Sequence, residues 1–79
     1  MRVRIQYFAM LREQRGLNEE TIAVPGSDLR SLYDALARQH GFTLPSRNVR
    51  AAVNDELCAW DRPLADGDFV VFLPPVAGG

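Results

Sequence analysis

The sequence predicts a small α+β domain in which a mixed sheet of about five strands packs against one main helix. Two patterns predict this class. Apolar and polar residues alternate in several short segments, as in half-buried strands, and one longer segment has apolar residues at helical spacing. The chain has 79 residues, the size of one domain, so we expect residues 1–79 to form a single unit.

The first part of the chain favours two strands. Residues 2–7 alternate between polar and apolar, and residues 21–24 form a second short segment of strand type. Between them, residues 8–13 break the alternation and are compatible with a short helical turn before Gly16. We therefore expect residues 1–24 to form a hairpin with a long connection.

An amphipathic helix follows the turn signal Pro25-Gly26. Ser27 or Asp28 can cap its N-terminus, and Gly41 fits its C-terminal end. His40 is the only histidine and fits the last turn, where the helix dipole favours a cation. One face of the segment is apolar: Leu29, Leu32, Tyr33, Leu36 and Ala37.

The second half of the chain predicts three more strands. Residues 43–48 are expected to form a loop, and residues 49–53 alternate again. Residues 54–56 suit a hairpin turn into a strand at 57–59. In the irregular segment that follows, Leu64 is expected to fill the core.

The last strand, residues 69–73, follows a turn at Asp66-Gly67-Asp68 and is apolar on both faces. Val70 and Phe72 point to one face, and the other three side chains point to the opposite face. The order β-β-α-β-β-β suits a β-grasp (ubiquitin-like) fold. One helix cannot cover both faces of its sheet, so the remaining apolar side chains predict a protein partner.

Composition argues against several classes of function. The net charge is −1 and the pI about 5.7, so nothing points to a nucleic-acid or anionic-membrane surface. Cys58 is the only cysteine, which fits a reducing compartment, and no apolar run has the length of a membrane span, so we expect a cytoplasmic protein. No paired nucleophile and base, metal-ligand spacing or phosphate loop is present.

The most informative segment is the ending Pro74-Pro75-Val76-Ala77-Gly78-Gly79. Two prolines stiffen the exit from the last strand, and two glycines lack Cβ atoms. Residues 74–79 are therefore expected to form a stem with a thin, flexible Gly-Gly tip that enters a narrow site in another protein. The group it delivers is the Gly79 carboxylate. The chain contains no lysine, so only the α-amino group could capture that carboxylate, once activated, within the chain.

Residues 64–70, Leu-Ala-Asp-Gly-Asp-Phe-Val, and residues 72–79, Phe-Leu-Pro-Pro-Val-Ala-Gly-Gly, resemble the ending of the sulfur-carrier ubiquitin-like family. Within it, the small subunits of molybdopterin synthase are most similar. Further matching segments are Tyr7-Phe8-Ala9, Leu11-Arg12-Glu13, Ala52-Val53-Asn54 and Asp61-Arg62-Pro63-Leu64. Trp60 and Phe69 depart from the family pattern, which has a smaller or polar residue and an acidic residue there.

The resemblance implies a mechanism. An E1-like adenylating partner would use ATP to convert Gly79 into an acyl-adenylate, and sulfur would then replace one oxygen to give a thiocarboxylate. The tail would enter the large subunit of the synthase and donate sulfur to a pterin precursor, forming the dithiolene of molybdopterin in molybdenum cofactor biosynthesis. The family forms heterotetramers around a dimer of large subunits. No metal or cofactor is expected on this chain itself.

We place a partner-binding patch at the base of the tail. Phe8 is out of phase with the buried residues of the first strand, and Leu73 ends the last strand; Phe69 and Val71 would extend the patch. Arg12 matches the family's basic residue after strand one and is expected at the rim.

Three alternatives share the fold and stay open. The chain could carry sulfur for another pathway, be a ubiquitin-like modifier joined through Gly79 to a target lysine, or be a structural β-grasp module with an inert tail.

Overall fold

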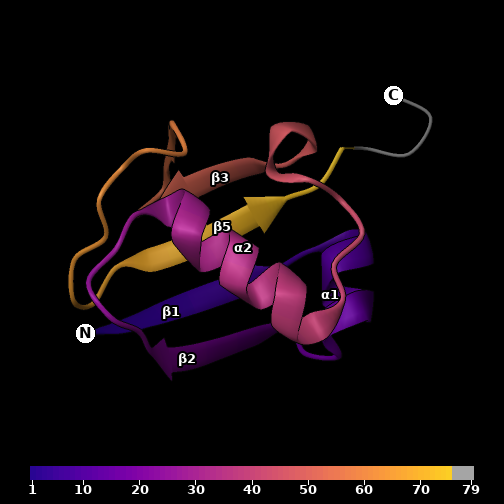
Figure 1. Ribbon diagram of the computed structural model, residues 1–79, viewed down its shortest axis with the longest axis horizontal. Coiled ribbons are helices and arrows are strands. Elements are labelled where there is room, and N and C mark those ends of the chain that lie inside the picture. The colour runs from indigo at the N-terminus through magenta and orange to yellow at the C-terminus, as the bar shows by residue number, and fades with distance from the viewer. Residues whose placement is uncertain (76–79) are drawn as a thin grey trace.

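The computed structural model describes residues 1–75 and shows an α+β domain built on one mixed sheet. Across the sheet the strand order is β2-β1-β5-β3-β4 (Figure 1). The central neighbours β1 and β5 are parallel, and the other pairs are antiparallel. The elements are β1 (Arg2–Tyr7), α1 (Ala9–Arg15), β2 (Glu19–Ala23), α2 (Leu29–His40), a 3-10 turn η1 (Ser46–Asn48), β3 (Arg50–Val53), β4 (Glu56–Cys58) and β5 (Phe69–Leu73). This is the predicted β-grasp arrangement.

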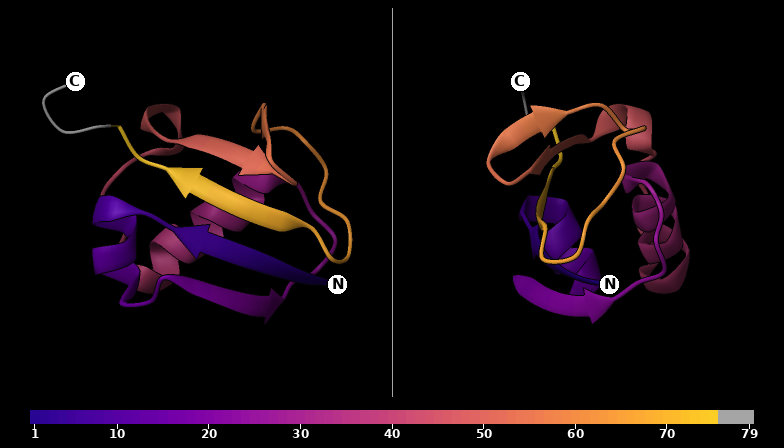
Figure 2. Two further views of the ribbon diagram at one scale, coloured as in Figure 1. Left: turned by 180° about the vertical axis from the view of Figure 1, so that it is seen from behind. Right: turned by 90° about the vertical axis from the view of Figure 1, so that its left-hand side faces the viewer.

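The helices leave one face of the sheet open. Helix α2 crosses one face, and α1 lies at the end of the sheet where β1 finishes (Figure 1). Seen from behind, the strands lie in front of α2 and no helix covers them (Figure 2). In the part of the chain that is described, no helix has the length and apolar character needed to cross a membrane.

Two segments differ from the sequence prediction. Residues 9–15 form a complete α-helix rather than a turn within a hairpin connection, and residues 46–48 form a 3-10 turn where a loop was expected. Helix α1 buries only Leu11, so its sequence carries little helical periodicity. It ends at Gly16, whose φ of 83° is left-handed.

Helix α2 matches the prediction from cap to cap. The Asp28 carboxylate accepts a hydrogen bond of 2.9 Å from the Ser31 backbone N–H, and this bond lowers the pKa of Asp28. Gly41 closes the helix with a φ of 73°.

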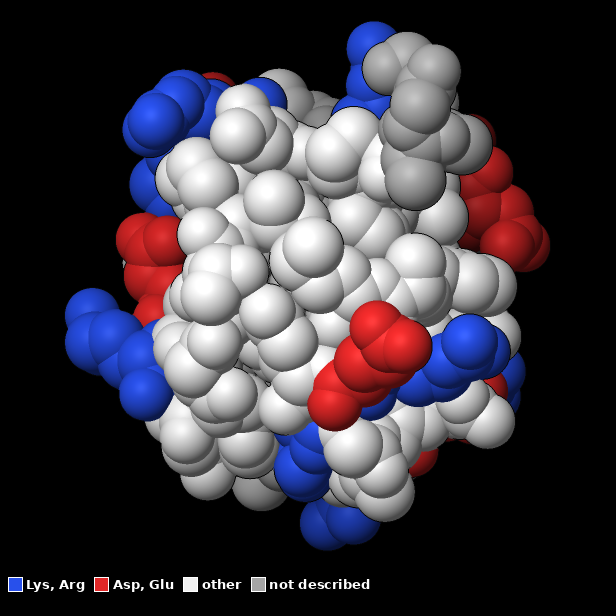
Figure 3. Space-filling model, turned by 90° about the vertical axis from the view of Figure 1, so that its right-hand side faces the viewer, with Lys and Arg blue, Asp and Glu red and all other residues white. Residues whose placement is uncertain are grey.

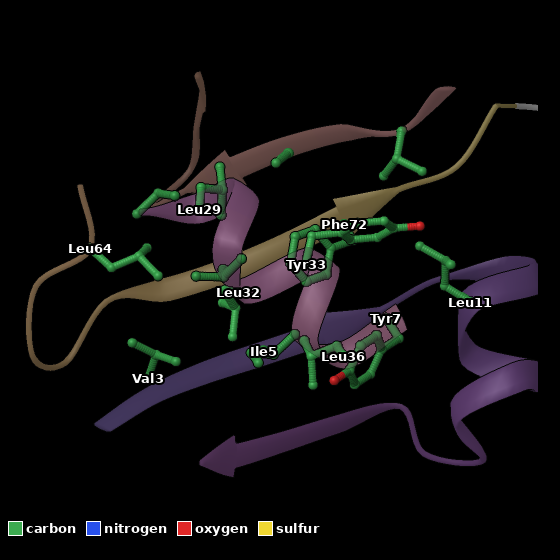
Figure 4. Packing of buried hydrophobic residues seen from close by; sticks show 14 of the residues in the cluster. Val3, Ile5, Tyr7, Leu11, Leu29, Leu32, Tyr33, Leu36, Leu64 and Phe72 are labelled. Carbon is green, nitrogen blue, oxygen red and sulfur yellow. The ribbon is translucent and has the colours of Figure 1, made fainter. Parts of the chain in front are cut away.

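The core lies between α2 and the sheet (Figure 4). Val70 and Phe72 are fully buried, as the alternation of β5 predicts. Phe72 packs edge-on against Tyr33 at 5.2 Å between ring centroids and is stacked with Trp60 at 6.0 Å. Leu64 is 9% exposed and fills the core as expected.

Candidate functional site

The predicted reactive tip of the tail, Val76–Gly79, lies outside the described residues. The structure does describe the stem that carries it: β5 ends at Leu73, Pro74 is half-buried and Pro75 is exposed. The surfaces on either side of this stem therefore form the candidate functional site.

Phe8 and Leu73 come together at the base of the tail. In the parallel register of β1 and β5, Tyr7 is opposite Phe72. The residues that follow them, Phe8 and Leu73, are therefore neighbours. Both line an open hollow of about 450 Å³, which we call the apolar hollow. Its lining residues are Phe8, Ala9, Met10, Leu44, Leu73, Pro74 and Pro75. Figure 3 shows that this end of the molecule is largely uncharged.

Sequence reasoning missed three residues of the apolar hollow, Ala9, Met10 and Leu44. Met10 is 43% exposed, more than Phe8 at 38%, yet it is a large apolar side chain. Met10 belongs to α1 and Leu44 to the segment after α2. A side-chain hydrogen bond joins these two segments, because the Gln14 amide donates to the Thr43 hydroxyl at 2.9 Å. Met10 could have been found only by recognising residues 9–15 as a helix.

Ala9 has a left-handed backbone conformation, with a φ of 50°. This conformation costs an L-residue about 1–2 kcal/mol. Phe8 itself is extended, with a φ of −128° and a ψ of 152°. The strained turn thus leads the chain from β1 into α1 at the wall of the apolar hollow, and strain of this kind concentrates at functional sites.

Phe69 and Val71 share the open face with Leu73 but do not line the apolar hollow. Phe69 is four residues before Leu73, about 13 Å along the strand. The Arg4 guanidinium covers its ring at 4.3 Å from the centroid. Phe69 and Val71 therefore lie outside the apolar hollow, and their contact with a partner stays a prediction.

The open face of the sheet has a further apolar region, which the sequence did not predict. Ala52 of β3 is opposite Val71 on one side and opposite Leu57 of β4 on the other. Leu57 is 59% exposed, the most exposed of the large apolar side chains in the described residues. The row Leu57-Ala52-Val71 gives the open face a second apolar region, which only the strand register reveals.

Arg12 is exposed on α1 and does not line the apolar hollow. It lines a separate hollow with Glu13, Gly16, Leu17 and Asn18. Whether it touches a partner therefore stays a prediction.

A basic hollow of about 490 Å³ lies on the other side of the stem. Arg47 of η1 and Arg50 at the start of β3 contribute its charged side chains. Its lining residues are Arg47, Asn48, Val49, Arg50, Leu73, Pro74 and Pro75. We call it the basic hollow.

A partly buried polar cluster joins α1 to β2. The Tyr7 hydroxyl donates to Glu20 at 2.7 Å, and Arg15, the last residue of α1, forms an ion pair with the same carboxylate at 2.7 Å. The hydrogen bond from Arg15 is the main cause that lowers the pKa of Glu20, whereas burial is the main cause that raises the pKa of Tyr7. The cluster fixes both the residue before Phe8 and the end of α1.

In the described residues the stem is flanked by two surface hollows, one apolar and one basic. Among the described residues, no group of three or more His, Cys, Asp and Glu side chains is placed to hold a metal ion. Cys58 is half-buried and ends β4, and His40 ends α2. What the arrangement can do is present an apolar and a basic surface on either side of a stem that leads to Gly-Gly.

The fold is that of the ubiquitin-like β-grasp proteins, and the sequence ends in Pro-Pro-Val-Ala-Gly-Gly. The chain belongs to the ThiS family, whose profile matches residues 5–79.

Three comparisons illustrate this class. The chain is 35% identical to a molybdopterin synthase sulfur carrier subunit of Escherichia coli strain K12, with 98% of this chain and 99% of the relative covered. A complex of subunits 1 and 2 of molybdopterin-converting factor from Helicobacter pylori contains a chain with 30% identity and a TM-score of 0.69, over 100% of both chains. SAMP1 from Haloferax volcanii has 25% identity and a TM-score of 0.82, over 100% of both chains.

Proposed function

We propose that this chain is the sulfur carrier subunit of a molybdopterin synthase, carrying sulfur on the carboxylate of Gly79. The observation that carries the proposal is the apolar hollow at the base of a stem that leads to Gly78-Gly79. Membership of the ThiS family and 35% identity to a sulfur carrier subunit over nearly the full chain support it.

The chemistry is confined to the end of the chain. An adenylating partner joins the Gly79 carboxylate to the α-phosphate of ATP and releases pyrophosphate. Sulfur at the oxidation level of hydrosulfide then attacks the acyl carbon, AMP leaves, and loss of the S–H proton gives the thiocarboxylate. Sulfur polarises more readily than oxygen, so this group is the better nucleophile toward a pterin precursor. This chain supplies the carrier, and the partners supply the ATP site and the pterin site.

Phe8 and Leu73 dock the carrier on the large subunit of the synthase. The complex of the two subunits is then a sulfurtransferase. The Helicobacter pylori complex of subunits 1 and 2 supports a partner of this kind. An exposed apolar patch rimmed by charge is the kind of surface that binds a protein. The adenylating enzyme needs the same tail and is a second partner of E1-like class. A reducing compartment such as the cytoplasm suits a thiocarboxylate.

A second candidate is a protein modifier, because SAMP1, a small archaeal modifier protein, has the same fold with a TM-score of 0.82. In that function the activated Gly79 forms an isopeptide bond with a target lysine. A covalent adduct that survives denaturation and thiol reduction distinguishes the modifier from the sulfur carrier.

Deletion of Gly79 tests the proposed function. No core residue is altered, so the truncated protein should melt at the wild-type temperature while sulfur transfer to the pterin precursor is lost. Gly26→Ala is the control, since a Cβ at Gly26 meets no atom within 4 Å, and it should keep full activity. Dithiolene formation by the truncated protein with purified partners would refute the proposal.

A further inference from the structure

The stem of the tail separates two hollows of opposite character. Leu73, Pro74 and Pro75 line both the apolar hollow and the basic hollow. A partner that holds this stem therefore meets apolar side chains on one side and arginine on the other. The apolar hollow is the proposed docking surface, whereas the chemistry proposed for Gly79 does not use the basic hollow.

The two arginines of the basic hollow are held on a fixed backbone. Turn η1 is closed by two hydrogen bonds, from the Asn48 N–H to the Pro45 carbonyl at 2.9 Å and from the Val49 N–H to the Ser46 carbonyl at 3.0 Å. Val49 is 4% exposed and anchors the turn in the core. Arg50 is opposite Leu73 in the register of β3 and β5. Their positions relative to the stem are thus set by the fold.

Their charge is not neutralised within the described residues. The ion pairs found there are Arg4–Glu19 and Arg15–Glu20, and neither includes Arg47 or Arg50. A third arginine increases the positive charge, because Arg30 donates to the Ser46 hydroxyl at 3.1 Å, beside Arg47. Exposed guanidinium groups that lack a carboxylate partner are suited to bind one on another molecule.

We propose that Arg47 and Arg50 recognise an acidic segment, bearing Asp or Glu carboxylates, on the large subunit that receives the tail. The proposal rests on the proposed function. It specifies, in addition, that the partner presents negative charge beside the stem. Two observations carry it: the unneutralised positive charge of the basic hollow and its continuity, through the stem, with the apolar hollow. Such pairs at the rim of an interface act mainly on the rate and specificity of association.

The experiment measures association of the carrier with the purified large subunit at low and at high salt. Arg47→Glu combined with Arg50→Glu should slow association at low salt by about tenfold or more, and less at high salt, because rim charges act through screened attraction. Arg47→Lys with Arg50→Lys should retain most of the wild-type rate. Arg2→Glu combined with Arg38→Glu makes the same change of charge at two exposed arginines outside the lining of the basic hollow; this matched control should associate like the wild type.

The thermal melts of all variants must match, since the substituted side chains are exposed. Equal association rates for Arg47→Glu with Arg50→Glu and for the control Arg2→Glu with Arg38→Glu at every salt concentration would overturn the proposal. Saturable shifts of the Arg47–Arg50 backbone amides on addition of ATP or inorganic phosphate alone would also overturn it, by showing a phosphate site. If the wild type does not bind the large subunit at all, the proposed function fails, and this inference fails with it.

Discussion

Phe8 and Leu73 meet at the base of the tail because β1 and β5 run parallel with Tyr7 opposite Phe72. Tyr7 and Phe72 are both buried, at 1% and 0% exposure. One residue further along each strand, the side chains point to the other face and remain exposed or half-buried. A single register thus determines both the end of the core and the start of the docking surface.

An Asp substitution should have different effects on the two faces of β5, lowering partner binding on one face and the stability of the domain on the other. Leu73→Asp should weaken binding to the large subunit by an order of magnitude or more, because a buried apolar anchor contributes about 1.5–3 kcal/mol. Phe72→Asp should unfold the domain, because Phe72 is fully buried. Thermal melting and a binding titration on both variants check this. If Leu73→Asp unfolds the domain and Phe72→Asp only weakens binding, the faces have been assigned the wrong way round.

The tail tip should tolerate no added side chain. Gly78→Ala adds one Cβ where the tail must pass through a narrow site, so sulfur transfer should fall while the melting temperature stays unchanged. Gly26→Ala makes the same chemical change at an open position and should alter neither quantity. A wild-type transfer rate for Gly78→Ala would show that the receiving site is not narrow.

The strain at Ala9 should be measurable as stability. Ala9→Gly should raise the free energy of unfolding by up to about 1 kcal/mol, because glycine adopts a left-handed φ without penalty. Ala9→Val should lower it, since a β-branched residue fits this conformation worst. Chemical denaturation of the three proteins gives the order. Equal stability of the Gly and Val variants would show that the φ of 50° carries no strain.

The ion pair of Glu20 and Arg15 predicts a dependence of stability on pH. Because the folded state lowers the pKa of Glu20 below 4.5, its contribution is complete above that pH and is lost as the pH falls through the folded-state value. Glu20→Gln should therefore reduce the acid-side slope of the unfolding free energy. Asp28, whose pKa is also lowered, should keep part of the slope. An unchanged slope in Glu20→Gln would contradict the assignment.

The strands and α2 were predictable because their patterns are strong. The apolar face of α2 and its two caps are local signals, and β5 has the predicted bounds, Phe69–Leu73. Helix α1 was predicted only as a short turn because a single buried residue, Leu11, holds it, and its Gln14–Thr43 contact joins segments far apart in the sequence. No local pattern reports a contact of that kind.

The candidate site was predictable in part. Phe8 and Leu73 were found because each breaks or ends an alternation. Met10 and Leu44 were not, because their proximity depends on α1 and on the segment after α2. Leu57 joins the open face only through the register of β3 and β4. Phe69 stays a predicted member of the partner patch: it shares a strand face with Leu73 that extends over about 13 Å, and it does not line the apolar hollow.

Sulfur on Gly79 can be detected in the intact mass of the protein purified from its native cells. We expect a species in which one oxygen is replaced by sulfur, with fragment ions that place the change at Gly79. Fragmentation is essential, because oxidation of Met1, Met10 or Cys58 adds nearly the same mass. Treatment with the adenylating partner, ATP and a sulfur donor should increase this species, and deletion of Gly79 should abolish it. A chain that stays a plain carboxylate under those conditions, or whose added mass lies only on Met or Cys, would contradict the account.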